Sequence, residues 1–202
     1  MKHPSTRALH AYWNQKRGNR AAPERADIDP AAIRHALGDT FMLAADFVDE
    51  LRFRLAGTRV CALFGREIKG EAFAELWSED SRERIAALLA TVNDEMLGAV
   101  AGVTARTADG SDTDLEILLL PLAHVGHARI RALGMLAPVV QPYWLGERPV
   151  VELTLGTLRH IGPETDHLGA PQFAATPLGG HRRHGFVVYS GGRETPSGER
   201  TG

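Results

Sequence analysis

The sequence predicts an α+β fold, in which short helices pack on one face of an antiparallel sheet. Its 202 residues are 44% hydrophobic and 24% charged, a balance typical of a globular domain with a core of its own. Short helical patterns come first along the chain, and strand patterns joined by tight turns follow them. The clearest turn is Asp109-Gly110, which lies between two strand patterns and favours a hairpin.

Two short helices are expected near the N-terminus. Residues 6–17 form the first, because Leu9 and Trp13 recur at helical spacing on one face. The second begins at Asp29, a favourable N-cap, with Pro30 at the first helical position. The polar residues between the two helices predict an extended connection.

Two strands and two helical pieces come next. Residues 40–47 are rich in apolar and aromatic side chains, and residues 51–56 alternate between apolar and charged ones, as a half-buried strand does. A helical turn after Gly57 and a second short helical piece over residues 71–77 complete this part of the chain.

A longer helix is expected over residues 80–97, since apolar residues hold helical spacing there. The period then changes to that of strands, which we expect at residues 100–107, 113–122 and 128–140. Residues 150–161 fit either a helix or a strand.

The composition divides the chain into four parts. They are an N-terminal helical extension, a core domain, a C-terminal strand or helix, and a tail, at residues 1–37, 38–142, 143–161 and 162–202. The tail is dense in Gly, Pro, Ser and Thr, so we expect it to be disordered. Residues 185–189 form an apolar island within it that would pair with a sheet edge or a partner.

Charge and cysteine content exclude several classes of protein. The formal net charge of −2 gives no basic excess for binding nucleic acid. The single cysteine, Cys61, excludes an intramolecular disulfide framework and a four-cysteine zinc site. No apolar run approaches the ~20 residues that span a bilayer, and the N-terminus has no signal core, so we expect no membrane insertion and a cytoplasmic location.

Five short motifs resemble those of a PAS domain. They are Tyr12-Trp13, Asp27-Ile28-Asp29-Pro30, Arg52-Phe53-Arg54-Leu55-Ala56-Gly57-Thr58, Leu63-Phe64-Gly65-Arg66-Glu67, and the segment from Lys69-Gly70 to Leu76-Trp77. Their order and spacing over residues 8–141 are similar to the stand-alone PAS subfamily common in alphaproteobacteria. The resemblance implies a five-stranded antiparallel sheet with short helices on one face. It also implies a non-enzymatic sensory or regulatory module of the bacterial cytoplasm, which contacts other signalling proteins and forms a homodimer.

In PAS domains a small ligand often lies between the sheet and the helices. The resemblance therefore implies a ligand pocket lined by Phe41, Phe53, Arg54, Thr58, Phe64 and Trp77. Aromatic side chains at these positions, with Phe73, either line such a pocket or fill it. Arg54 either holds an anionic ligand or pairs with a carboxylate such as Glu67 or Asp80. The identity of any cofactor stays unknown.

The first helix offers a dimer interface. Leu9, Tyr12 and Trp13 place apolar surface on a helix outside the core domain. They either pack on the sheet of their own protomer or contact a second copy, as PAS domains do.

The sequence favours neither a metal nor a known chromophore. His124 and His127 with Glu116 lack a diagnostic metal spacing, and His35 is a weak candidate for a haem ligand. Cys61 follows Arg59-Val60, unlike the Asn-Cys-Arg-Phe-Leu motif of light-sensing PAS domains, which argues against flavin photochemistry.

No catalytic residue is predicted, because the sequence has neither a Gly-x-Ser-x-Gly motif nor a persuasive Cys–His pair. One alternative is a small α+β cavity enzyme of the isomerase or dehydratase type, for which Asp46 and His35 are the best acid–base pair. Another is a scaffold with a fully packed core and no ligand.

Overall fold

The computed structural model describes residues 1–45, 50–123, 131–162, 181–183 and 186–188. Contacts divide the chain into two units, residues 1–167 and 168–202. In the second unit, β7 (His181–Arg183) and β8 (Phe186–Val188) pair with each other as antiparallel strands. The apolar island thus pairs with its own neighbouring segment, while most of the tail expected to be disordered lies outside the described residues.

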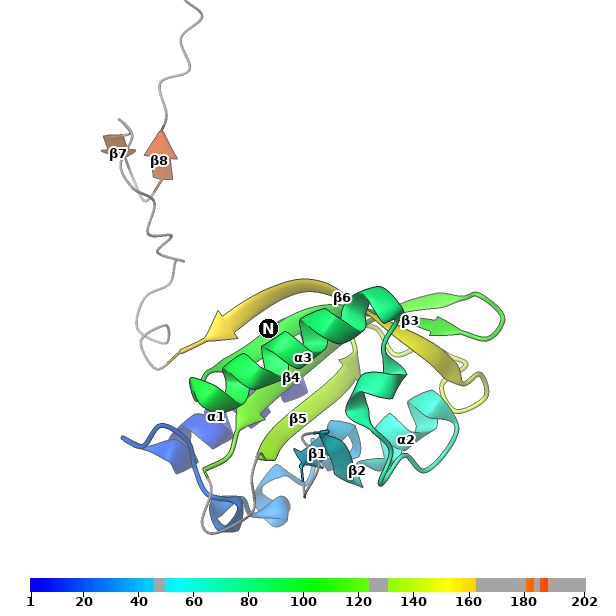
Figure 1. The fold of residues 1–202 in the computed structure, drawn as a ribbon, viewed down its shortest axis with the longest axis horizontal. Coiled ribbons are helices and arrows are strands. Elements are labelled where there is room, and N and C mark those ends of the chain that lie inside the picture. Colours follow the sequence, from blue (N-terminus) through cyan, green and yellow to red (C-terminus); the bar gives the residue numbers. More distant parts are fainter. Residues whose placement is uncertain (46–49, 124–130, 163–180, 184–185, 189–202) are drawn as a thin grey trace, which may run out of the picture. The chain divides into compact units, whose positions relative to one another are not determined.

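The first unit is built on a six-stranded antiparallel sheet (Figure 1). Its strands are β1 (Thr40–Ala44), β2 (Arg52–Ala56), β3 (Gly98–Thr107), β4 (Asp112–Pro121), β5 (Arg131–Pro138) and β6 (Val150–Ile161). They lie in the order β2-β1-β5-β4-β3-β6. The predicted α+β class is confirmed, with one strand more than the resemblance implied. The extra strand is β6, which pairs with β3 along most of its length.

Most helical segments are short, and α3 (Glu79–Asp94) is the longer helix that was expected. The segments are α1 (Pro4–Arg17), η1 (Arg25–Asp27), η2 (Pro30–Ile33), η3 (Leu37–Asp39), α2 (Thr58–Phe64), η4 (Phe73–Leu76) and α3. Asp29 caps η2 through its side chain, which accepts a hydrogen bond from the Ala31 N–H. The second expected helix is in fact two separate 3₁₀ turns, η2 and η3. Over the described residues, the helices are all too short or too polar to cross a bilayer.

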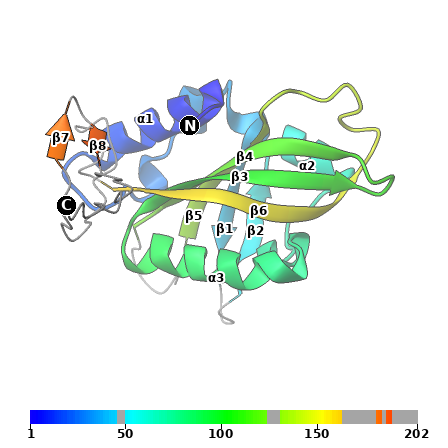
Figure 2. The same cartoon turned by 90° about the horizontal axis from the view of Figure 1, so that it is seen from above.

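Helices cover both faces of the sheet rather than one (Figure 2). On one face α2, η4 and α3 enclose the larger core, which contains the aromatic residues of β1 and β2. On the other face α1 packs Leu9 and Trp13 over Leu118 and Met135 in a second core. Because both of its faces are covered, β4 is buried from residue 115 to residue 121.

The free edge of β6 is partly closed by α3. The Arg84 guanidinium donates hydrogen bonds to the backbone carbonyls of Leu155, at 2.9 Å, and Gly156, at 3.1 Å. The Ser81 hydroxyl accepts a hydrogen bond from the Leu155 N–H at 3.0 Å. These side chains occupy backbone groups that an edge strand otherwise presents to a neighbour.

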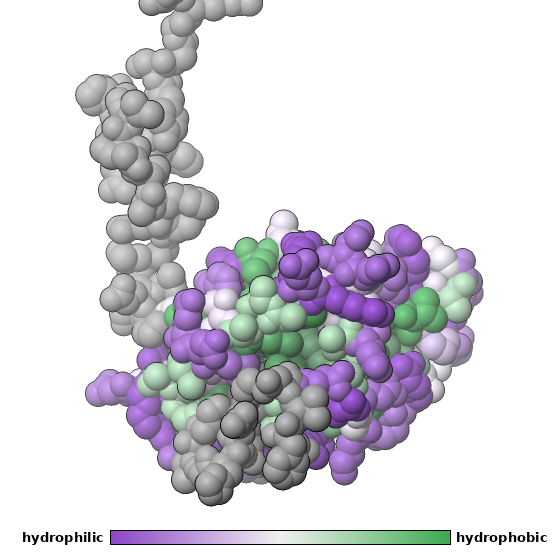
Figure 3. Space-filling model, viewed as in Figure 1, coloured by the Kyte–Doolittle hydropathy of each residue, from purple (hydrophilic) through white to green (hydrophobic). Residues whose placement is uncertain are grey.

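Polar and apolar patches alternate on the face of the molecule that Figure 3 shows.

Candidate functional site

Four aromatic rings meet between the sheet and the helices that cover its inner face. Phe41 of β1, Phe53 of β2 and Phe73 of η4 contact one another with ring centroids 5.5–5.7 Å apart. Trp77, just after η4, meets Phe73 edge to face at 5.6 Å. All four side chains are almost fully buried, so they form the centre of the larger core. We call these four residues the aromatic cluster.

A glycine opposite Phe41 makes room for the cluster. Phe41 pairs with Gly134 of β5 across the sheet, and its ring lies over the glycine. A Cβ atom at residue 134 would approach the ring carbons to 2.2 Å, far inside contact distance. A glycine within a strand often marks such a close approach, but the sequence alone does not say which group comes close.

Trp77 has a buried donor without an acceptor. Its indole Nε1 is the one buried side-chain nitrogen or oxygen within the described residues that has no hydrogen-bond partner. The side chain is 1% exposed, so bulk solvent does not reach the donor. An unpaired buried polar group costs about 1–3 kcal/mol. A ligand atom that accepts a hydrogen bond at this point would remove that cost.

The six predicted pocket residues separate into two groups. Phe41, Phe53 and Trp77 lie in the aromatic cluster, and Phe64 of α2 is buried in the same core. The structure brings these four together. Two polar residues of the set, Arg54 and Thr58, lie apart from them and are exposed. The alternation in β2 explains the position of Arg54, because neighbouring residues of a strand point to opposite faces.

An ion pair with a buried carboxylate, which the sequence does not reveal, joins α2 to η3. The Arg59 guanidinium donates to both carboxylate oxygens of Asp39, from Nε at 2.7 Å and from a terminal nitrogen at 2.6 Å. Asp39 is almost fully buried, and its hydrogen bonds to Arg59 raise the pKa of the guanidinium. The two residues are twenty positions apart and lie in different elements, so no local pattern announces the pair.

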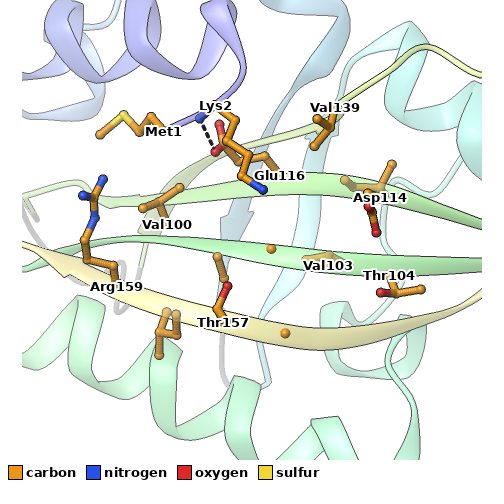
Figure 4. Close-up of a pocket in the computed structure, with 15 residues that line it drawn as sticks. Met1, Lys2, Val100, Val103, Thr104, Asp114, Glu116, Val139, Thr157 and Arg159 are labelled. Atoms are coloured by element: carbon orange, nitrogen blue, oxygen red, sulfur yellow. Dashed lines mark hydrogen bonds between the residues drawn. The ribbon is translucent and has the colours of Figure 1, made fainter.

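Glu116 of β4 holds the start of α1 from the outer face of the sheet. Its carboxylate accepts a hydrogen bond from the backbone N–H group of Lys2, at 2.5 Å (Figure 4), and another from that of His3, at 3.0 Å. Burial raises the pKa of Glu116, but these two hydrogen bonds and one from the Thr6 hydroxyl outweigh burial, so the pKa lies below its usual value. Glu116, considered in the sequence only as a weak metal ligand, is a structural anchor here.

A groove of about 390 Å³ opens beside this anchor. Lys2, Asp114, Glu116 and Arg159 contribute charged side chains to its lining. It lies on the outer face of the sheet, away from the aromatic cluster, and none of the predicted pocket residues lines it.

The dimer residues of α1 contact their own sheet. Leu9 and Trp13 are buried, and the Trp13 indole N–H donates to the Pro121 carbonyl at 2.8 Å. Tyr12 is half-buried, and its hydroxyl accepts a hydrogen bond from the Asp29 N–H at 2.8 Å. Leu9 and Trp13 therefore pack on the sheet of their own protomer, which was one of the two alternatives for this helix.

The remaining candidates do not assemble into a reactive site. Burial raises the pKa of the Cys61 thiol, whose sulfur lies 3.6 Å from a Glu67 carboxylate oxygen, so the thiol stays protonated at neutral pH. His35 is exposed. Asp46, His124 and His127 lie outside the described residues. Within the part of the chain that the structure describes, no three His, Cys, Asp or Glu residues cluster as metal ligands.

The sequence of the chain matches a known protein family. A sequence model described as PAS domain matches residues 1–137, which include α1 and most of the sheet. No curated protein matches the chain.

Several solved structures are similar at low identity. A LOV protein of Rhodobacter sphaeroides shares 15% identity over 52% of this chain, with a TM-score of 0.41, and the match spans 60% of that protein's length. The light-state structure of the blue-light photoreceptor Aureochrome1 LOV shares 15% identity over 55% of this chain and 89% of its own, with a TM-score of 0.42. A PAS domain from Colwellia psychrerythraea shares 15% identity over 55% of this chain and 97% of its own, with a TM-score of 0.39. The assignment of a family rests on the sequence match over residues 1–137.

Proposed function

The chain belongs to the PAS domain family, and from that premise we propose that it is a non-enzymatic sensory or regulatory module of the bacterial cytoplasm. It acts by contact with other signalling proteins and forms a homodimer. The proposal is supported by the matched region, which includes the sheet from β1 to β5 and the helices on both of its faces.

A small ligand adjusts the activity of the module in this proposal. The observation that carries it is the unpaired Trp77 indole nitrogen, buried beside Phe73 in the aromatic cluster. The ligand is an apolar, mainly planar molecule with one hydrogen-bond acceptor, because the single unsatisfied donor lies in an apolar core beside the ring of Phe73. Such a ligand shifts the module between two states only if it binds one of them more tightly.

The homodimer uses the outer side of α1. Leu9 and Trp13 are buried in their own protomer, so Tyr12 is the member of the predicted interface with surface left for a partner. Its ring also lies under the Lys16 ammonium, 5.5 Å from the ring centroid, which adds a charge at the edge of this surface.

Mass spectrometry of the full chain, purified from a bacterial host, tests the proposal. We expect the mass of a dimer in native spectra, with an added non-protein mass that is lost on denaturation. The Trp77→Phe variant should lose the added mass, whereas Tyr143→Phe, at a residue 86% exposed, should keep it. A monomer without added mass would contradict both the homodimer and the ligand.

A further inference from the structure

The groove on the outer face of the sheet has an open floor. Strands β3, β4 and β6 form the floor, and the segment before α1 forms one wall (Figure 4). Gly102 of β3 and Gly156 of β6 both lie there, where side chains would otherwise stand. A Cβ atom at residue 102 would meet only the Thr157 hydroxyl, at an ordinary 3.6 Å. The space above Gly102 is therefore not filled by neighbouring side chains, and a ligand can occupy it.

A β-bulge shapes the same floor. The register of β3 against β6 shifts between Ala101 and Val103, so Gly102 faces two residues of β6, Gly156 and Thr157. A bulge bends its strand and changes the direction of the side chains that follow, and bulges are common beside functional sites. Here the Thr157 side chain lines the groove as a result.

The charged side chains of the groove differ in whether they have a bonding partner. Neither the Lys2 ammonium nor the Arg159 guanidinium makes an ion pair with any residue that the structure describes. The Glu116 carboxylate accepts hydrogen bonds from the backbone N–H groups of Lys2 and His3 at the start of α1. Asp114 lies at the end opposite Arg159, with Lys2 between them (Figure 4). The groove thus holds two cations, Arg159 at one end and Lys2 near the middle, and neither forms an ion pair with a described carboxylate.

We infer that this groove binds a small molecule that carries a carboxylate or phosphate group. Arg159 holds two oxygens of the anionic group with its planar fork, and Lys2, near the middle of the groove, adds positive charge along the site. The Thr157 hydroxyl offers a hydrogen-bond donor on the floor of the same groove. The rest of the molecule lies along the floor, against the apolar side chains of Val100 and Val139. This site is independent of the proposed ligand in the aromatic cluster, because the two are on opposite faces of the sheet.

Titration of the ¹⁵N-labelled full chain with inorganic phosphate, and separately with succinate, tests the inference at constant ionic strength. We expect saturable shifts of the Gly102 and Gly156 amide signals, and the probe with the lower dissociation constant identifies the preferred anion. Removing a charged hydrogen-bond partner weakens binding by about tenfold or more, so we expect that loss for Arg159→Gln. Lys69→Gln, which removes an exposed cation outside the groove, should leave binding unchanged.

A second variant separates a shaped site from simple charge attraction. Gly102→Val fills the floor without changing any charge, and its added atoms begin from a position in ordinary contact, so the fold should survive. An unchanged circular dichroism spectrum checks that it does, and binding of both probes should then be lost. Wild-type affinity in Gly102→Val or Arg159→Gln, or glycine shifts that do not saturate, would overturn the inference.

Discussion

Arg59 holds both carboxylate oxygens of Asp39, at 2.7 and 2.6 Å, and joins the start of α2 to the turn that precedes β1. The aspartate is buried, while the arginine remains partly open to solvent. Gly38 lies under the guanidinium, since a Cβ atom there would come within 2.8 Å of the Arg59 Cζ atom. The pair therefore fixes where β1 begins, and with it the position of Phe41.

The first prediction concerns this pair. Asp39→Asn should lower the free energy of unfolding by about 1–3 kcal/mol, because a buried charged partner is lost and Arg59 keeps its charge. Glu71→Gln, which breaks the exposed pair with Arg66, should cost less than about 1 kcal/mol. Urea unfolding of both variants measures the difference, and equal losses would contradict it.

The second prediction concerns pH. The folded-state pKa of Glu116 is lowered, so its contribution to stability is complete above the pKa of an unfolded glutamate, about 4.3, and is lost as the pH falls through the lower folded value. Glu116→Gln should lack this part of the acid-induced loss, when unfolding is followed between pH 7 and pH 3. The exposed Glu75→Gln serves as the control and should keep the wild-type profile.

The third prediction tests the close contact of Phe41 with Gly134. Gly134→Ala should destabilise the protein by about 1–3 kcal/mol, because the added methyl group displaces the ring and overpacks the core. Near-ultraviolet circular dichroism should change with it, since the ring belongs to the aromatic cluster. Gly102→Ala adds the same atom in ordinary contact, so a similar loss in that variant would argue against a specific clash.

The fourth prediction compares two buried tryptophans. Trp77→Phe removes an unpaired donor, whereas Trp13→Phe removes a donor that serves the Pro121 carbonyl. The same atoms are deleted in both, so Trp13→Phe should be more destabilising by about 1–2 kcal/mol in thermal or urea unfolding. The reverse order would show that the Trp77 indole nitrogen finds a partner in solution.

Local signals in the sequence predicted the elements that local contacts determine. The turn at Asp109-Gly110 is confirmed: Gly110 has a φ of 83°, and β3 pairs with β4 on either side of the turn. The Asp109 carboxylate also accepts hydrogen bonds from Thr107 and Ser111, which lower its pKa to about 2. The long helix was expected at residues 80–97 and forms at Glu79–Asp94, so only its ends differ.

Features that depend on contacts between residues far apart in the sequence could not be predicted from it. Residues 150–161 alternate weakly, and their pairing with β3, which a local pattern does not contain, makes them a strand. The aromatic members of the predicted pocket meet because apolar residues at regular spacing face one core. Lys2 and Glu116 are 114 positions apart, so neither the anchor of α1 nor the groove beside it has a signature in the sequence.

The hydrogen bonds of Arg84 to the end of the sheet have a consequence for self-association. Strand addition by a second chain, the first step of fibril growth, requires free carbonyl groups along an edge. Because one long side chain already occupies the carbonyls of Leu155 and Gly156, an incoming strand meets no acceptor there. Replacing this single arginine would thus free these two acceptors and make the edge of β6 a better template for aggregation.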